Sequence, residues 1–310
     1  MKKIAFIFPG QGSQSVGMGK DFFENSAVAK EMISKASQRL GINFEELLFT
    51  ENENLSKTEF TQPAILLVSS IAMAIFKEKC DIKPEFVLGH SLGEFSALVA
   101  SGAIDYLDAI ELVHKRGQFM TDACAGGGAG MMALVGMDDA TVEKVCEEQQ
   151  SKGKKVWPAN YNMDGQLVLA GLKADLESLV DTFKEAGAKR AIVLDMSVAS
   201  HCELLKPAVE NLRPYLDEYV QDTFTTSVIS NVTATAYNTK EEAVDLLCKQ
   251  LISPVKYKHS IEANSANVDM LIEFGNGIVL KGLNRKITKV PTLNVSDMAS
   301  LESTLVALND

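Results

Sequence analysis

Apolar runs followed by helical patterns recur along the chain and predict buried strands that lead into helices. Residues 4–8 (IAFIF) are apolar throughout and stop at Pro9-Gly10, which is typical of a buried strand that ends in a glycine loop. Residues 62–79 carry apolar positions at helical spacing, and residues 86–102 read as a strand, a tight turn and a helix. Strands followed by helices indicate a parallel α/β sheet, whose functional sites usually lie at the carboxyl ends of its strands.

A different pattern begins after residues 125–130 (AGGGAG), the most glycine-rich stretch of the chain and a natural hinge. The following segments read as strand, helix, two strands, helix and strand: 131–136, 138–150, 155–162, 165–171, 172–187 and 189–195. This βαββαβ order is that of a ferredoxin-like subdomain. From about residue 197 the alternation of strands and helices resumes. We therefore expect an α/β core at 1–125 and 197–310, a ferredoxin-like subdomain at 126–196, and a ligand site in the crevice between them.

The amino-acid composition excludes several classes of function. The chain has 310 residues, with 30 Lys and Arg against 41 Asp and Glu and a formal net charge of −11. This charge excludes a broadly basic surface for nucleic acid or anionic membrane, although a local basic patch is still possible. Five scattered cysteines without CxxC spacing indicate reduced thiols in a cytoplasmic protein, and four histidines without HExxH argue against a catalytic metal. The opening apolar run is too short for a signal peptide, and we expect no membrane-spanning segment.

The strongest chemical signal is Gly89-His90-Ser91-Leu92-Gly93, a G-x-S-x-G motif between a predicted strand and a predicted helix. In this context the motif predicts a nucleophile elbow, because the glycines allow a sharp turn that presents Ser91 at the helix N-terminus. Free N–H groups at that terminus favour developing negative charge. The alternative is a serine that only caps the helix, and the strand–helix context favours the nucleophile.

A serine nucleophile needs a base, and His201 is the best candidate among the four histidines. It follows the last strand of the inserted unit, where the chain would re-enter the core beside the crevice. His90 is adjacent to Ser91 in the sequence, but its side chain should point away from that of Ser91. The residues near His114 and His259 do not indicate that either acts as the base. From the residues alone, a structural histidine at position 201 is nearly as good an interpretation.

The loop Gly10-Gln11-Gly12-Ser13-Gln14 follows the first predicted strand. It is no P-loop, and it does not complete the dinucleotide motif G-x-G-x-x-G, because position 15 is serine. Its backbone can approach a ligand closely, which suits one donor of an oxyanion hole, the other being the amide of Leu92 after the nucleophile. Without Ser91, a plain glycine turn would be the preferred interpretation.

Arg116 lies on or beside the apolar stripe of a predicted helix, an unusual position for a solvated charge. Such an arginine either extends its charged end to water or meets an anion. A planar guanidinium can bind a carboxylate through two hydrogen bonds. The residues alone favour extension to water.

Taken together, these motifs resemble the malonyl-CoA:acyl carrier protein transacylases of bacterial fatty acid synthesis. The resemblance runs nearly from end to end and is carried by FPGQGSQ (8–14), TQPAIL (61–66), GHSLGE (89–94), HKRG (114–117), PANYN with QLVLAG (158–171), SVASHC (197–202) and QLISPVKY (250–257). Many matches in the same order are far more specific than any one of them.

The resemblance implies a role for each matched residue. Ser91 would be the acylated nucleophile and His201 its base, oriented by a backbone carbonyl at the position of Gln250. The amides of Gln11 and Leu92 would form the oxyanion hole, and Arg116 would bind the malonyl carboxylate. The implied fold is an α/β-hydrolase-like core with the ferredoxin-like insertion.

The implied reaction is a ping-pong transfer from malonyl-CoA to the phosphopantetheine thiol of holo acyl carrier protein. No metal or redox cofactor is implied, and we expect a cytoplasmic monomer that binds neither nucleic acid nor membrane. Carrier proteins are acidic, so basic residues near the crevice would have to offset the negative charge of this chain. The candidates are Lys154, Lys155, Lys189, Arg190, Lys281, Arg285 and Lys286.

The sequence departs from the family pattern at two places. Gly275-Asn276-Gly277 stands where a Pro-Gly pair is common, and we interpret it as a loop variation. Ser200 precedes the histidine, where related polyketide acyltransferases selective for malonyl carry phenylalanine. Serine there weakens slightly the choice of malonyl over a branched extender unit.

Three alternatives remain open from the sequence. The chain could be an acyltransferase for another extender unit in polyketide assembly. It could be a serine thioesterase or esterase, in which a carboxylate such as Asp195 would orient the histidine. It could also be a non-catalytic subunit that binds the carrier protein, although such a protein would need none of Ser91, His201 and Arg116.

Overall fold

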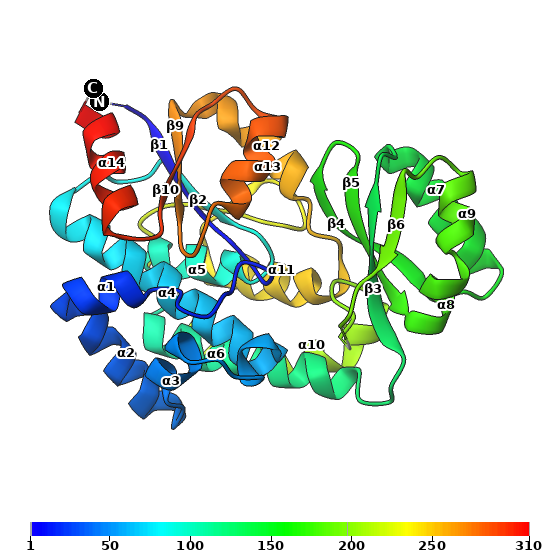
Figure 1. The fold of residues 1–310 in the computed structure, drawn as a ribbon, viewed down its shortest axis with the longest axis horizontal. Helices are drawn as coiled ribbons and strands as arrows, with labels where there is room; N and C mark the ends of the chain where they lie inside the picture. The colour runs from blue at the N-terminus through cyan, green and yellow to red at the C-terminus, as the bar shows by residue number, and fades with distance from the viewer. Residues whose placement is uncertain (1, 197, 310) are drawn as a thin grey trace.

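Two β-sheets organise the computed structural model, which describes residues 2–196 and 198–309 (Figure 1). The larger sheet has the strand order β10-β9-β1-β2-β7-β8. Its neighbours pair in parallel except β7 and β8, which are antiparallel. Its strands are β1 (Ile4–Phe8), β2 (Phe86–Gly89), β7 (Val228–Ile229), β8 (Ala236–Tyr237), β9 (Met270–Phe274) and β10 (Thr292–Val295). The predicted parallel α/β sheet is therefore confirmed.

Both faces of this sheet are buried, which explains why strands β1 and β2 are apolar without alternation. Along β1, Ile4, Phe6 and Phe8 face one hydrophobic core, whereas Ala5 and Ile7 face another. Helices cover both faces (Figure 1). Those on or around the larger sheet are α1 (Lys20–Asn25), α2 (Ala27–Leu40), α3 (Phe44–Phe49), α4 (Thr58–Lys79), α5 (Gly93–Ser101), α6 (Tyr106–Ala123), α10 (Lys206–Tyr219), α11 (Lys240–Ile252), α12 (Tyr257–Asn264), α13 (Val279–Ile287) and α14 (Met298–Asn309).

Helix α4 is apolar because it lies in the core. By length and composition it could cross a membrane, but 83% of its apolar window is buried inside the structure. Phe76 of this helix packs edge-on against Phe6 and Phe274 of the sheet, at centroid distances of 5.8 and 5.1 Å. The apolar surface of α4 is thus used within the fold.

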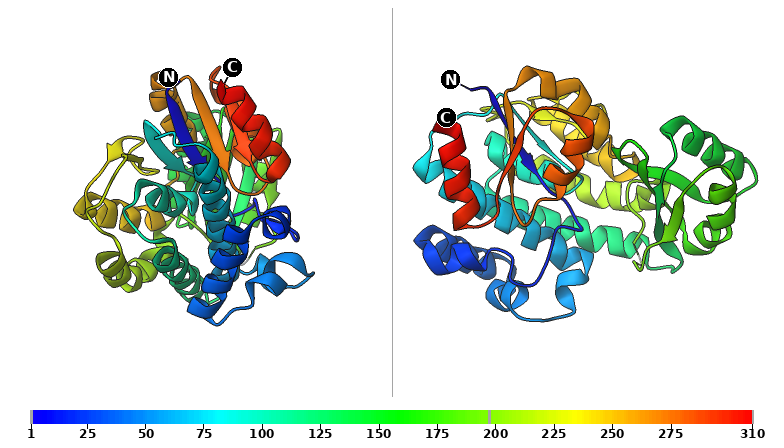
Figure 2. Two further views of the ribbon diagram at one scale, coloured as in Figure 1. Left: turned by 90° about the vertical axis from the view of Figure 1, so that its left-hand side faces the viewer. Right: turned by 45° about the horizontal axis from the view of Figure 1, so that its top comes forward.

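The second sheet is antiparallel, with the order β4-β5-β3-β6, and forms a separate lobe beside the first (Figure 2). Its elements are β3 (Ala129–Val135), α7 (Asp139–Ser151), β4 (Val156–Met163), β5 (Gln166–Leu172), α8 (Lys173–Ser178), α9 (Val180–Glu185) and β6 (Arg190–Val193). The long helix predicted over 172–187 is divided into α8 and α9 at Leu179, whose φ and ψ of −99° and −2° depart from helical values. Residue 197, where we expected the chain to return to the core, lies outside the described residues.

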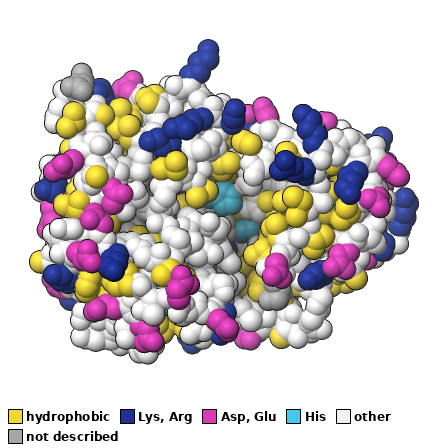
Figure 3. Space-filling model, viewed as in Figure 1, with side chains coloured by type: hydrophobic (Ala, Val, Ile, Leu, Met, Phe, Trp, Pro, Cys, Tyr) yellow, Lys and Arg dark blue, Asp and Glu magenta, His cyan; other side chains and the backbone are white. Residues whose placement is uncertain are grey.

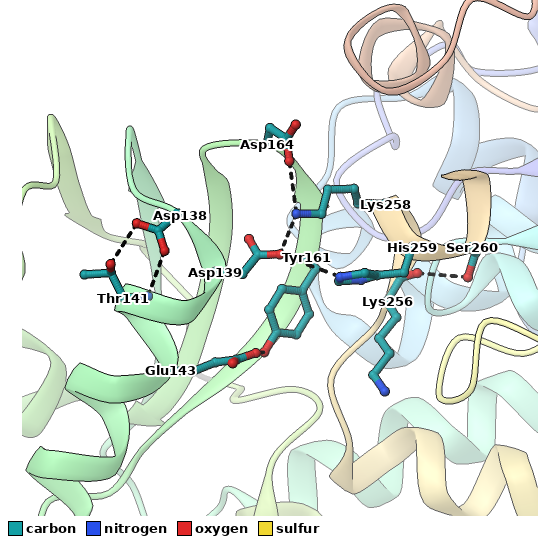
Figure 4. A network of polar contacts seen from close by, with 10 residues as sticks. All are labelled: Asp138, Asp139, Thr141, Glu143, Tyr161, Asp164, Lys256, Lys258, His259 and Ser260. Carbon is teal, nitrogen blue, oxygen red and sulfur yellow. Dashed lines mark hydrogen bonds and ion pairs between the residues drawn. The ribbon is translucent and has the colours of Figure 1, made fainter. Parts of the chain in front are cut away.

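Main-chain bonds, together with the side-chain bonds of Lys258 that Figure 4 shows, hold the second sheet against the larger core beside β4. Val255, which precedes α12, donates its N–H to Ala159 and accepts the N–H of Tyr161, at 2.8 and 2.9 Å. The buried ammonium of Lys258 donates to Asp139 at the start of α7 and to Asp164 in the β4–β5 turn, the latter at 3.1 Å. Strand β4 is therefore held in a defined position against the core.

Candidate active site

Ser91 stands at the predicted sharp turn between β2 and α5. Its φ is 52°, in the left-handed region that non-glycine residues rarely adopt. The flanking glycines are required by close packing. A Cβ on Gly89 would lie 1.8 Å from the carbonyl carbon of Gly93, and a Cβ on Gly93 would lie 2.1 Å from the carbonyl oxygen of Phe8. The turn therefore packs directly against the end of β1 and holds Ser91 in a strained backbone conformation.

Asn231, which the sequence analysis did not single out, supports this turn. Its Oδ1 accepts the Ser91 N–H at 2.7 Å, and its Nδ2 donates to the Gly89 carbonyl at 2.6 Å. Asn231 follows β7, the strand beside β2, so both residues lie at the carboxyl edge of the sheet. The only signal in the sequence is its position just after a short strand.

His201 lies beside Ser91 although 110 residues separate them along the chain. Its Nε2 is 2.7 Å from Ser91 Oγ, and its Nδ1 is 2.7 Å from the backbone carbonyl of Gln250 on α11. A carbonyl only accepts, so Nδ1 carries the proton and the lone pair of Nε2 points at the serine. Asp195 lines the same cavity, but the Nδ1 partner is the Gln250 carbonyl. This geometry differs from the carboxylate-oriented histidine of the thioesterase alternative.

Burial sets the protonation of His201. Loss of solvation, together with the nearby positive charge of Arg116, lowers its pKa to about 3, although the Gln250 carbonyl acts in the opposite direction. The imidazole is consequently neutral near pH 7. A neutral imidazole with a free Nε2 lone pair can accept the proton of Ser91.

Arg116 is 1% exposed, so the prediction that its charge extends to water is wrong. It projects from α6, and its terminal nitrogens donate to Oε1 of Gln62 at 2.7 Å and to Oε1 of Gln250 at 3.0 Å. The guanidinium also lies 5.2 Å from the centre of the Phe95 ring. Desolvation lowers its pKa to about 10, which still leaves it charged at neutral pH. Arg116 is thus a buried cation held by neutral amides at the edge of the cavity.

Gln11 and Leu92 line the cavity on the side of the glycine loop. Within residues 2–196 and 198–309, neither backbone N–H has a hydrogen-bond acceptor. The loop is packed closely onto the elbow, since a Cβ on Gly10 would lie 2.3 Å from the His90 carbonyl oxygen. Asn276 in the variant glycine loop after β9 donates to the Ser13 carbonyl at 2.6 Å and so steadies the same segment.

These residues meet in a cavity of about 460 Å³ between the two sheets. The space-filling view shows histidine side chains at the bottom of a hollow between the lobes (Figure 3). The larger core contributes the elbow, His201 and α13, whereas the second sheet contributes Asn160, Asn162, Gln166 and Val168. His90 Nε2 donates to Oδ1 of Asn162 at 2.8 Å, which links the two parts. Ser200 also lines the cavity.

The other two histidines are elsewhere. His114 contacts the Glu59 carbonyl at 2.7 Å, and His259 packs on Tyr161 at the junction of the two sheets. In the part of the chain that the structure describes, no three His, Cys, Asp or Glu side chains gather as a metal site would require.

Comparisons with known proteins agree with the geometry. Residues 5–274 match the family described as acyl transferase domain. The malonyl CoA-acyl carrier protein transacylase of Bacillus subtilis is 41% identical, with 100% of this chain and 98% of that protein covered. The protein of the same name from Escherichia coli K12 is 40% identical over 99% of each chain.

Solved structures give the same result. The malonyl-CoA:acyl carrier protein transacylase from Helicobacter pylori superposes with a TM-score of 0.96 at 43% identity, covering 100% of this chain and 99% of that one. A malonyl-transacylase in complex with its type II PKS acyl-carrier protein superposes with a TM-score of 0.94 at 37% identity, over 98% and 99% of the two chains. Given these matches over the full length, the chain belongs to the acyl transferase family and, within it, to the malonyl-CoA:acyl carrier protein transacylases.

Proposed function

We propose that this acyltransferase moves a malonyl group from malonyl-CoA to the phosphopantetheine thiol of an acyl carrier protein through malonyl-Ser91, and so supplies the extender unit for fatty acid synthesis. The observation that carries the proposal is the 2.7 Å contact of Ser91 Oγ with a neutral His201 in a cavity that also holds the buried Arg116. The relatives named above carry that activity in their names.

In the first half-reaction, His201 Nε2 takes the Ser91 proton while Ser91 Oγ attacks the thioester carbonyl. The backbone N–H groups of Gln11 and Leu92 stabilise the resulting oxyanion, each contributing about 3 kcal/mol. The carbon–sulfur bond then breaks, and His201 returns the proton to the departing thiolate of CoA. Malonyl-Ser91 remains.

The second half-reaction reverses these roles. The phosphopantetheine thiol gives its proton to His201 and attacks malonyl-Ser91, and the proton passes back to Ser91 Oγ as the ester bond breaks. Throughout, the Gln250 carbonyl holds Nδ1–H and so keeps the imidazole in one tautomer. These groups supply every step, so we propose that no cofactor is needed.

Arg116 would select the acyl group. A buried guanidinium whose present partners are neutral amides favours a ligand that brings a negative charge, and the free carboxylate of malonyl can accept two of its N–H bonds. An acetyl group offers no such charge.

We also propose finer features of the fold and its partners. The strand order β4-β5-β3-β6, combined with the chain order of its strands and helices, supports a ferredoxin-like subdomain at 126–196, with an α/β-hydrolase-like core at 1–125 and 197–310. The protein would act in the cytoplasm, and its five free thiols are in keeping with that compartment. It would be a monomer that contacts CoA and carrier protein but neither nucleic acid nor membrane.

The carrier protein would dock beside the cavity. Of the seven basic candidates, Lys154 is paired with Asp175 at 3.1 Å and Lys281 donates to Asn294 at 2.9 Å. Exposed side chains remain at Lys155, Lys189, Arg190, Arg285 and Lys286. Arg285 and Lys286 lie near the end of α13, and earlier residues of the same helix line the cavity. Lysines and arginines are visible along the rim of the hollow (Figure 3).

Intact-protein mass spectrometry tests the proposal. The wild-type protein and Ser91→Ala are mixed with malonyl-CoA, with acetyl-CoA as a control, and holo carrier protein is added afterwards. We expect a malonyl adduct that needs Ser91, persists in water and moves to the carrier. An adduct lost to water without the carrier would indicate a thioesterase, and no adduct would overturn the proposed mechanism.

A further inference from the structure

The buried carboxylate of Glu94 lies at the centre of the polar network behind the site, yet it has no place in the reaction described above. Glu94 is 0% exposed, sits in the first turn of α5 and does not line the cavity. Burying a carboxylate is costly unless its oxygens are fully hydrogen-bonded. The partners of this side chain therefore indicate what it does.

Glu94 binds two residues that hold the catalytic groups. Its Oε2 accepts Gln250 Nε2 at 2.7 Å and the Asn231 N–H at 3.1 Å, and its Oε1 accepts the Tyr237 hydroxyl at 3.2 Å. Asn231 in turn bonds the N–H of Ser91. Gln250 bonds Arg116 through its side chain and His201 through its backbone carbonyl.

The orientation of the Gln250 amide matters for Arg116. The guanidinium can only donate, so the amide must present its oxygen to Arg116 and its nitrogen to the other side. On that other side, Nε2 donates to Glu94 and to the Ser91 carbonyl, the latter at 3.0 Å. A reversed amide would place N–H groups against Arg116 and oxygen against two acceptors, so an acceptor at Glu94 favours the observed orientation.

We propose that Glu94 is a positioning residue that holds the Gln250 amide with its oxygen toward Arg116 and thereby fixes the guanidinium that selects a carboxylated acyl group. The inference rests on the proposed function of Arg116. It assigns to Glu94 a role in acyl selectivity that is separate from contact with substrate.

Two substitutions distinguish the effect of holding the Gln250 amide in place from the effect of the negative charge of Glu94. In Glu94→Gln, the side-chain oxygen can still accept from Gln250 and Asn231, while the new NH₂ faces the Tyr237 hydroxyl, which can rotate to accept. Glu94→Leu removes every acceptor and leaves buried donors without partners. Tyr237→Phe is the matched control, because it removes a bond to Glu94 and leaves the Gln250 contact in place.

The experiment measures the initial rate of Ser91 acylation with malonyl-CoA and with acetyl-CoA, and compares the malonyl-to-acetyl ratio among variants. We expect Glu94→Leu to lower this ratio roughly tenfold or more, and Glu94→Gln and Tyr237→Phe to stay near the wild-type ratio. If Glu94→Leu does not fold, Glu94→Asp withdraws the carboxylate by one methylene, keeps the charge, and should lower the ratio in the same direction.

Equal loss of malonyl and acetyl transfer in Glu94→Leu, with an unchanged ratio, would overturn the inference and leave Glu94 with a general structural role. A Glu94→Gln variant as unselective as Glu94→Leu would also overturn it, because charge and not placement would then matter. Failure of the proposed function is distinguishable, since wild-type protein would then show no transferable malonyl adduct.

Discussion

His201 Nε2 lies 2.7 Å from Ser91 Oγ, and both residues have left-handed backbone conformations, with φ of 61° and 52°. Such a backbone conformation costs a non-glycine residue about 1–3 kcal/mol, so it persists only where surrounding contacts enforce it. The enforcing contacts are visible: Asn231 holds the N–H of Ser91, and the Gln250 carbonyl holds the imidazole. The nucleophile and its base are therefore positioned before any substrate arrives.

The pH dependence of acylation should reflect the buried state of His201. Because burial lowers its pKa to about 3, the neutral base persists as pH falls from 8 to about 5. We expect no loss of the malonyl transfer rate near the ordinary histidine pKa of about 6.5. Single-turnover rates of Ser91 acylation between these pH values provide the measurement.

Glu94→Gln serves as the control for that profile, because Glu94 also titrates near neutral pH. A tenfold fall in rate per pH unit below about 6.5 that persists in Glu94→Gln would show that His201 is protonated in the ordinary range, contrary to this prediction.

Removing the Arg116 guanidinium should change selectivity more than it changes catalysis. A lost partner of a buried charge costs on the order of 2–5 kcal/mol, so Arg116→Ala should slow malonyl transfer by roughly thirtyfold to a few thousandfold. Acetyl transfer should persist or rise. Kinetics with both CoA esters provide the check, with Arg213→Ala as a control that removes an exposed arginine paired with Asp245. A parallel fall with both substrates would exclude the carboxylate-binding role.

The elbow should not tolerate a methyl group at Gly93. A Cβ there would lie 2.1 Å from the backbone oxygen of Phe8, so Gly93→Ala must displace β1 or α5. We expect a loss of about 3 kcal/mol or more in the free energy of unfolding. Gly282→Ala is the matched control, because open space surrounds that position in α13 and alanine favours a helix by up to about 1 kcal/mol. Urea denaturation of both variants measures the difference; similar stabilities would contradict the packing argument.

Stability should depend on pH through Glu94. Burial raises its pKa to about 7 in the folded protein, whereas the unfolded chain has the ordinary value near 4.5. The folded state thus binds this proton more tightly, and the contribution of Glu94 to stability falls as pH rises from about 4.5 to about 7. As pH rises across that interval, the free energy of unfolding of Glu94→Gln should increase by on the order of 3 kcal/mol relative to that of the wild type. Chemical denaturation at several pH values measures the gain, and a constant difference would refute the assignment.

Carrier docking should respond to charge near α13. The double variant Arg285→Glu with Lys286→Glu should raise the KM for the carrier protein roughly tenfold and leave acylation by malonyl-CoA nearly unchanged. The wild-type KM for the carrier should also rise with salt, because exposed charges are screened within about 10 Å at 0.1 M salt. Lys20→Glu with Lys35→Glu changes the net charge equally on α1 and α2 and serves as the control. A KM insensitive to both salt and the α13 variant would remove this docking surface.

The local features of this protein could be predicted from its amino-acid sequence. Continuous apolar runs such as 4–8 predicted strands buried on both faces, and the spacing of glycines around Ser91 predicted the turn between β2 and α5. These features depend on backbone conformation and on burial over a few residues, which neighbouring residues encode. The order of the motifs was sufficient to identify the family.

Which side chains meet in the site depends on long-range packing and became clear from the three-dimensional arrangement. Arg116 was ambiguous because helical periodicity places a residue on a face but does not say what covers that face; the covering residues, Gln62 and Gln250, come from α4 and α11. The roles of Asn231 and Glu94 could not be predicted from their neighbours in the sequence, because each acts through contacts with residues more than a hundred positions away. The contact of Ser91 with Asn231 arises because parallel strands bring their carboxyl ends to one edge, and the contacts of Arg116 and Glu94 arise from the packing of helices, so the chemistry of the site depends on packing that no local pattern contains.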